Sequence, residues 1–380
     1  MDTAIRDDTR ELETLISQLV DQAGTRLATS PGEATAAAFV NGRLRRAGMR
    51  VSTYELRVAA RPGGVYLLCG ALSLLAFALT VSLPLPSLLL ALNLLAWIGL
   101  DSFGWPIPPV GRRRASQNIV GTRAIVGAAG LEPVAPRWRV VLLAPLDTPQ
   151  TWRGLATLAG PTRGARLARL AAVALVTIGA SAALLVPGLW WLVGLPGATL
   201  GLLMLIAALL PPRPTPTDGG VAALTTMIVA TQRLEQLQRV ELWAVAVGAS
   251  STDPRGVITL LPRYPFDPAH TLFIALEDLA RGQVIYATRE GVVGTADKLL
   301  LRLAAAADAA DPLIDAEPRP LAVPGHLAAP LRRHGYRALT ILARPAPGAP
   351  SGPATPLDSQ LVERATRLVV SIVRHLEAEG

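Results

Sequence analysis

Polar residues that could take part in chemistry follow directly after apolar segments of the sequence. The run from Trp138 to Thr148, W-R-V-V-L-L-A-P-L-D-T, includes Pro145, Leu146 and Asp147 at its end. A continuous apolar run of this length predicts a strand that is buried on both faces of a parallel sheet. Ligand sites of open α/β sheets lie at the carboxyl ends of such strands. We therefore expect chemistry, if the chain performs any, near Asp147.

Two further predicted strands end in candidate residues. Ser250 and Ser251 follow the buried run that begins at Val240, and Glu277 and Asp278 follow the run that begins at Thr271. Hydroxyl and carboxylate groups at one sheet edge suit a polar or cationic ligand. Ser250 is not predicted to be a nucleophile, because G-A-S-S lacks the G-x-S-x-G elbow. Each acidic candidate also has a structural interpretation, as a helix cap or a solvated strand end.

The elements that would position these residues alternate along the chain. Strands alternating with helices predict an α/β fold with a mostly parallel sheet and helices on both faces. Beyond the segments above, we expect strands at 49–58, 116–123, 283–288 and 338–343, and helices at 33–47, 218–237, 296–307 and 357–377.

The composition requires that part of this chain lies in lipid. Of 380 residues, 51% are hydrophobic and only 17% are charged, which is too apolar for an ordinary soluble enzyme. About 20 apolar residues span a hydrocarbon core of roughly 30 Å. Uncharged runs predict two hairpins of membrane-spanning helices, which we expect to pack as one four-helix bundle; core hairpins are the weaker alternative. The runs are Gly64–Leu83, Ser87–Leu100, Leu170–Val186 and Leu189–Leu210.

The hairpins divide the sequence into five segments. We expect one α/β domain from residues 1–63, 106–165 and 212–380, interrupted by transmembrane hairpins at 64–105 and 166–211. The charged start of the chain lacks the apolar region of a signal peptide. Cys69, the single cysteine, excludes an internal disulfide.

Arginine dominates the net charge of +8, and Lys298 is the only lysine. Arginines flank the four apolar runs, whereas neither predicted hairpin turn carries a charge. This pattern places the soluble segments in the cytoplasm and favours anionic lipid over nucleic acid as a partner. We find no basic stripe interleaved with aromatics and no nucleic-acid motif. The flanking arginines are Arg57, Arg61, Arg112–Arg114, Arg163, Arg166, Arg169 and Arg213.

Seven sequence blocks occur in an order that resembles a known family. They are P-G-E-A-T-A-A-A-F-V from Pro31, S-Q-N-I-V-G-T from Ser116, V-V-L-L-A-P-L-D-T from Val140, T-D-G-G-V-A-A-L from Thr217, A-V-A-V-G-A-S-S from Ala244, F-I-A-L-E-D-L-A-R-G from Phe273 and A-T-P-L-D-S from Ala354. Their order resembles the M28 family of zinc aminopeptidases. The resemblance covers nearly all of the chain outside the hairpins and implies that family's α/β domain.

The resemblance also implies that most of the family's zinc site is missing. A site of this type needs two histidines, a bridging carboxylate, further acidic ligands and a glutamate base. Pro145 stands at the first histidine, with Asp147 behind it, and Pro216 at the bridging aspartate, two positions before Asp218. Ser250 and Ser251 replace the glutamate pair, and Glu277, or Asp278 with a slip of one residue, matches the fourth ligand. Ala354 stands at the last histidine, with Asp358 in the same loop.

These losses favour a membrane-anchored pseudo-enzyme without a cofactor that binds or scaffolds a peptide or protein partner. The alternative is a membrane-bound metallo-aminopeptidase with a rearranged zinc site built from Asp147, Asp218, Glu277 or Asp278, and Asp358. A transporter is less well supported, because the spans lack ionisable residues. Histidines do not rescue the metal site, since His270, His326, His334 and His375 match none of the ligand positions.

Overall fold

The chain folds into two compact units. We analysed a computed structural model, which describes residues 2–59, 63–102, 110–125, 136–160, 162–186, 188–210, 213–214, 219–291, 294–322, 325–345 and 357–379. The α/β unit comprises Met1–Ala60, Arg113–Pro149 and Pro214–Gly380, and the helical unit comprises Arg61–Arg112 and Gln150–Arg213. Three candidate positions, Pro216, Asp218 and Ala354, lie outside the described residues.

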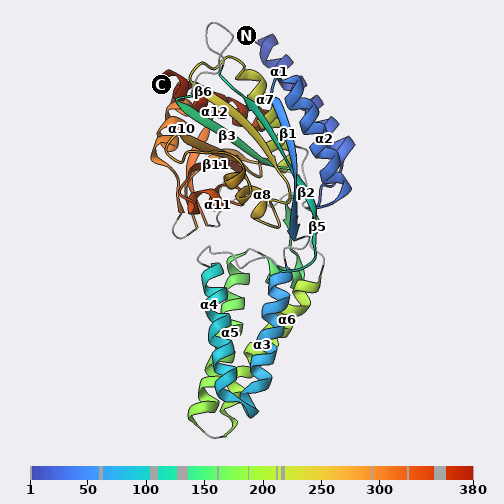
Figure 1. Ribbon diagram of the computed structural model, residues 1–380, viewed down its shortest axis with the longest axis vertical. Coiled ribbons are helices and arrows are strands. Elements are labelled where there is room, and N and C mark those ends of the chain that lie inside the picture. Colours follow the sequence, from blue (N-terminus) through green and yellow to red (C-terminus); the bar gives the residue numbers. More distant parts are fainter. Residues whose placement is uncertain are drawn as a thin grey trace. The chain divides into compact units, whose positions relative to one another are not determined.

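A mixed sheet forms the centre of the α/β unit (Figure 1). Its four central strands, β6, β3, β7 and β11, run parallel. β1 pairs antiparallel with β2, and β2 with β6, whereas β8 pairs antiparallel with β11 and parallel with β10. In spatial order, the described strands are β1 (Arg50–Ala59), β2 (Arg113–Arg123), β6 (Val240–Val247), β3 (Trp138–Pro145), β7 (Thr271–Leu276), β11 (Arg337–Arg344), β8 (Gln283–Glu290) and β10 (Ala316–Leu321), and β9 (Gly294–Thr295) pairs with β8.

The central strand β3 is buried on both faces, as predicted. Val140 and Leu142 belong to the core on one face of the sheet, and Val141 and Leu143 belong to the core on the other. Helices cover both faces, which confirms the predicted fold class. The larger core takes residues from α1 (Asp2–Ala23), α2 (Pro31–Arg46), α7 (Gly219–Arg233), α10 (Lys298–Ala310) and α12 (Ser359–Glu379), and the smaller core from α8 (Arg255–Ile258), α9 (Leu260–Arg263) and α11 (Ala328–Arg333).

The edge strand β10 was not predicted from the sequence. Its residues read A-E-P-R-P-L, and Pro318 and Pro320 argue against a strand in any central position. At a sheet edge, a residue whose N–H would face away from the neighbouring strand can be proline without loss of a ladder bond. Among the described strands, β10 pairs only with β8, and its register shifts between Arg319 and Pro320.

The helical unit contains the four predicted apolar helices. All four are long and apolar enough to cross a membrane, the fourth when it is counted from Trp191 to Leu209. The third begins at Arg163 rather than Leu170, because the Thr162 side chain caps it by accepting from the amide of Ala165. The helices are α3 (Gly64–Ser82), α4 (Pro84–Ser102), α5 (Arg163–Leu185) and α6 (Leu195–Leu209), with short 3₁₀ helices η1 (Gly154–Ala159) and η2 (Leu189–Gly194); a two-stranded ladder pairs β4 (Gln150–Thr151) with β5 (Arg213–Pro214).

The two hairpins pack against each other, as expected. α3 contacts α6, and α4 contacts α5. A Cβ atom added at Gly70 of α3 would lie 2.9 Å from the carbonyl oxygen of Gly201 in α6, so the backbones approach closely at this point. Small residues permit this close helix packing, which is typical of helices in lipid.

Candidate functional site

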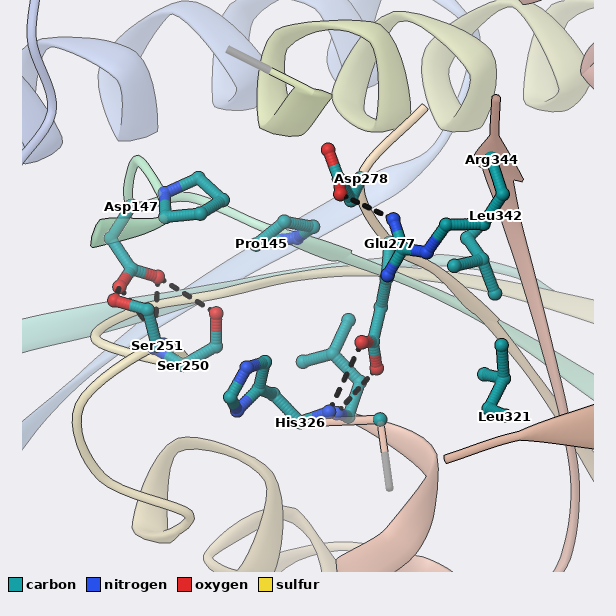
Figure 2. A pocket seen from close by; sticks show the side chains of 13 residues that line it. Pro145, Asp147, Ser250, Ser251, Glu277, Asp278, Leu321, His326, Leu342 and Arg344 are labelled. Atoms are coloured by element: carbon teal, nitrogen blue, oxygen red, sulfur yellow. Dashed lines mark hydrogen bonds and ion pairs between the residues drawn. The ribbon is translucent and has the colours of Figure 1, made fainter. Parts of the chain in front are cut away.

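A pocket of about 160 Å³ lies at the carboxyl ends of the parallel strands (Figure 2). β3 ends at Pro145, β7 is followed by Glu277 and β11 ends at Arg344, so the topology brings these residues to one sheet edge. Apolar side chains form much of the wall, with charged groups among them. The lining residues are Pro145, Asp147, Pro149, Ser250, Ser251, Glu277, Asp278, Leu321, Gly325, His326, Leu327, Leu342 and Arg344.

Asp147 is fully buried and its carboxylate is occupied by donors from this chain. Its Oδ1 accepts from the amide and hydroxyl of Ser250 at 2.8 and 2.7 Å. Its Oδ2 accepts from the Ser251 amide at 2.9 Å and from the Ser251 hydroxyl. Figure 2 shows both serines turned toward the carboxylate. The hydrogen bonds to Asp147 therefore order the turn that follows β6.

That turn requires support because its backbone is unusual. Ala249 adopts φ of +50°, a conformation that costs free energy for a residue with a side chain. Gly248 lies against β2, where an added Cβ would meet the Gln117 carbonyl oxygen at 2.4 Å. The backbone at Gly248 therefore packs closely against β2. The hydrogen bonds to Asp147 offset the backbone strain at Ala249.

A second buried carboxylate, Glu33, supports the same turn from α2. Its Oε1 accepts from the Ala249 amide at 2.6 Å and from the Ser116 hydroxyl at 3.0 Å. Its Oε2 accepts from the Thr29 amide at 2.6 Å. Burial, with a smaller contribution from the charge of Asp147, raises the pKa of Glu33 to about 7. Reasoning from the sequence did not identify Glu33 as part of the site.

Glu277 forms a wall of the pocket by holding a backbone turn. Its carboxylate accepts from the amides of His326 and Leu327 at 3.1 and 2.7 Å. Burial raises the pKa of Glu277, and the charge of nearby Glu290 acts in the same direction. Glu290 is itself buried and accepts from the Gly325 amide at 2.7 Å. Two carboxylates, one directly after β7 and one at the end of β8, therefore fix the 325–327 segment.

Asp278 and Arg344 form an ion pair at the rim of the pocket. The Arg344 Nη1 atom lies 2.6 Å from Asp278 Oδ2, and each side chain is about half exposed. Asp278 adopts φ of +34°, and its backbone oxygen accepts from the Ala343 amide at 3.1 Å. This pair is the most accessible charged feature of the pocket wall.

The remaining residues considered from the sequence differ in whether they line the pocket. Asp358 does not line the pocket; it caps α12, where its Oδ1 accepts from the Gln360 amide at 2.9 Å. His326, which matches no ligand position of the resembled family, does line the pocket. Arg344 could have been found from the sequence, because it directly follows the predicted strand at 338–343. No comparable signal marks His326, since the tertiary fold alone brings its loop to this edge.

The described residues do not fit a zinc pair. Among them, no group of three or more His, Cys, Asp and Glu residues is arranged to hold a metal ion. The physical reason is that Asp147, Glu277 and Asp278 already accept hydrogen bonds or pair with Arg344. In this arrangement, the pocket suits a small ligand that combines a polar or cationic group with an apolar part.

Comparisons with known proteins agree on the fold. No protein-family model matches the sequence, and no curated protein matches it. A zinc aminopeptidase from Bacillus subtilis is 11% identical, with a TM-score of 0.56 over 97% of this chain and 94% of that one. A leucine aminopeptidase precursor from Bacteroides thetaiotaomicron is 11% identical, with a TM-score of 0.53 over 96% of both chains. A glutaminyl cyclase from Porphyromonas gingivalis is 11% identical, with a TM-score of 0.51 over 98% of both chains. The chain therefore has the fold of these enzymes.

Proposed function

We propose that this chain is a catalytically inactive, M28 peptidase-like protein that is anchored in the cell membrane and binds or scaffolds a peptide or protein partner. The observation that carries the proposal is the state of Asp147, which is fully buried and accepts four hydrogen bonds from Ser250 and Ser251. A carboxylate whose lone pairs face its own chain is not available to a metal ion or to a substrate.

The chemistry of the neighbouring positions supports the same conclusion. Pro145 has no side-chain donor, and a serine hydroxyl is a weak replacement for a carboxylate on zinc. Loss of a general base alone typically lowers a rate by about a hundred- to ten-thousand-fold. The pocket that remains has the Asp278–Arg344 ion pair at its rim and an apolar wall, which suit the binding of a ligand with a polar or cationic group and an apolar part.

A second candidate function is a membrane-bound metallo-aminopeptidase with a rearranged zinc site. The observation that favours it is that Glu277, Asp278 and His326 line one pocket. To bind zinc, Glu277 would have to release the amides of His326 and Leu327, and Asp278 would have to leave Arg344. These costs make a rearranged site the weaker proposal.

Elemental analysis and activity distinguish the two candidates. Detergent-purified protein is expected to contain far less than one zinc ion per chain and to hydrolyse no aminoacyl substrate when zinc is added. The matched variant is Glu277→Gln, which retains one acceptor oxygen for the 326–327 amides. If the wild type binds zinc stoichiometrically and Glu277→Gln loses both metal and activity, the rearranged site is correct and the pseudo-enzyme proposal fails.

We expect all segments of the α/β unit to lie in the cytoplasm, because arginines flank the spans only on the side of those segments. The test uses two single cysteines in a Cys69→Ser background. Gln360→Cys is exposed in the α/β unit, and Leu189→Cys lies in the uncharged hairpin turn, where the leucine is 70% exposed. An impermeant thiol reagent should label position 189 in intact cells and position 360 only after permeabilisation. The reverse pattern would contradict the orientation.

A further inference from the structure

The charges of the helical unit are segregated at one end. Its described residues include six arginines and one acidic residue, Asp101. α3 and α5 begin at this end, and α4 and α6 end there, so the short segments outside the helices meet at the same place. The opposite end, formed by the hairpin turns, carries no charge among its described residues. The arginines are Arg112, Arg153, Arg163, Arg166, Arg169 and Arg213.

Arg169 is the buried anchor of this end. It is 2% exposed, and its Nη1 donates to the carbonyl oxygens of Leu158 and Gly160 at 2.7 and 2.8 Å. Its guanidinium lies 4.1 Å from the ring centroid of Tyr66, whose hydroxyl donates to Asp101 at 2.9 Å. Arg169 thus fixes η1 against α3 and α5, and the lone carboxylate of the unit is engaged in this network.

The other five arginines form an outward-facing set, which we call the arginine collar. Arg112, Arg153, Arg163 and Arg213 are exposed, and Arg166 is half-buried. In the described part of the chain, none of the five forms an ion pair with a carboxylate. Their positive charge is therefore not neutralised by any described carboxylate and is available to a partner.

Apolar side chains lie among the collar residues. Leu167, directly after Arg166, is 67% exposed, and Trp152 precedes Arg153 and is partly exposed. Alternation of arginine with leucine and tryptophan is the composition expected at a membrane surface, where aromatic rings and cationic groups meet the lipid headgroups. A soluble acidic protein would offer no apolar phase for Leu167.

We infer that the arginine collar binds the phosphate groups of anionic phospholipids. Guanidinium groups bind phosphate in a bidentate manner, which an ammonium group cannot do, and every charge of the collar is an arginine. Each basic residue near an anionic surface typically strengthens binding about fivefold. The inference rests on the proposed membrane anchoring and adds to it a preference among lipids.

The test measures which lipid the full chain retains from a mixed micelle. The protein is purified in detergent with equal amounts of phosphatidylglycerol and phosphatidylcholine, and bound lipids are counted by native mass spectrometry. The wild type is expected to retain phosphatidylglycerol in at least fivefold excess. Arg163→Gln/Arg166→Gln should reduce this excess about fivefold or more, and Arg163→Lys/Arg166→Lys should reduce it less.

The control removes the same charge elsewhere. Arg302→Gln/Arg364→Gln changes one exposed and one partly exposed arginine of the α/β unit and should leave the lipid ratio unchanged. Equal retention of both lipids by the wild type, or equal losses in both double variants, would overturn the inference. Displacement of phosphatidylglycerol by inorganic phosphate alone would also overturn it, because the collar would then bind free phosphate. Failure of the protein to enter phosphatidylcholine nanodiscs would instead refute the membrane anchoring.

Discussion

The Asp147→Ala variant is expected to lose about 2–6 kcal/mol of the free energy of unfolding, because two backbone amides of the turn after β6, one buried and one partly buried, would lose their acceptor. Each such amide typically costs about 1–3 kcal/mol. The Ser250 and Ser251 hydroxyls can reorient, so they add little. This loss is a large fraction of the 5–15 kcal/mol that is typical of a folded domain.

Asp358→Ala is the matched control for this prediction. Asp358 is also an aspartate that accepts from a backbone amide, but it is exposed at the start of α12. Removal of an exposed helix cap typically costs about 1 kcal/mol. Denaturant unfolding of the two variants in detergent compares them directly. Equal losses in both, or a gain in stability for Asp147→Ala, would show that Asp147 is not a structural acceptor.

Glu33 is expected to make the α/β unit less stable as the pH rises toward neutrality. Its pKa in the folded chain is about 7, above the ordinary value of 4.5, so folding favours its protonated form. The stabilisation is fully present below pH 4.5 and is lost as the pH rises through 7. A difference of about 2.5 pKa units corresponds to about 3 kcal/mol, and Glu33 is almost fully buried.

The measurement compares the wild type with Glu33→Gln between pH 5 and 8. Hydrogen exchange at the amides of β2 and β6 reports the stability of the α/β unit separately from the helical unit. Glu33→Gln should remove most of the pH dependence, whatever its absolute stability. Glu241→Gln, which breaks a partly buried ion pair with Arg139, should retain the dependence because Glu33 is still present. An unchanged slope in Glu33→Gln would refute the assignment.

The α/β fold was predictable because its strongest signals are local. The runs that begin at Trp138, Val240 and Thr271 are apolar enough to be buried strands, and each one is a central parallel strand. The four apolar helices were identified in the same way, from long runs that contain no charged residue. β10 was missed because its prolines exclude a central strand, and the sequence does not reveal which strand lies at an edge.

The site was only partly predictable, for a different physical reason. Strand ends indicated Asp147, Ser250, Ser251, Glu277 and Asp278, and all five line the pocket. The sequence does not determine where their lone pairs point. Whether a carboxylate faces a ligand or its own backbone depends on turns that are formed by residues more than a hundred positions away, as in the pairing of residues 147 and 250. Glu33 and His326 were missed because their partners are also far away in the sequence: Ala249 lies 216 positions from Glu33, and Glu277 lies 49 positions from His326.

The two prolines of β10 have a consequence for the proposed membrane anchoring, which would bring many copies of this chain together in one bilayer. Confinement to a plane raises the local concentration, and an unpaired sheet edge is then a template for intermolecular aggregation. Pro318 and Pro320 lack the N–H donors that an incoming strand would need, and Glu317 and Arg319 add charge at the same edge. Under the proposed membrane anchoring, adjacent copies are therefore not expected to join their sheets along β10.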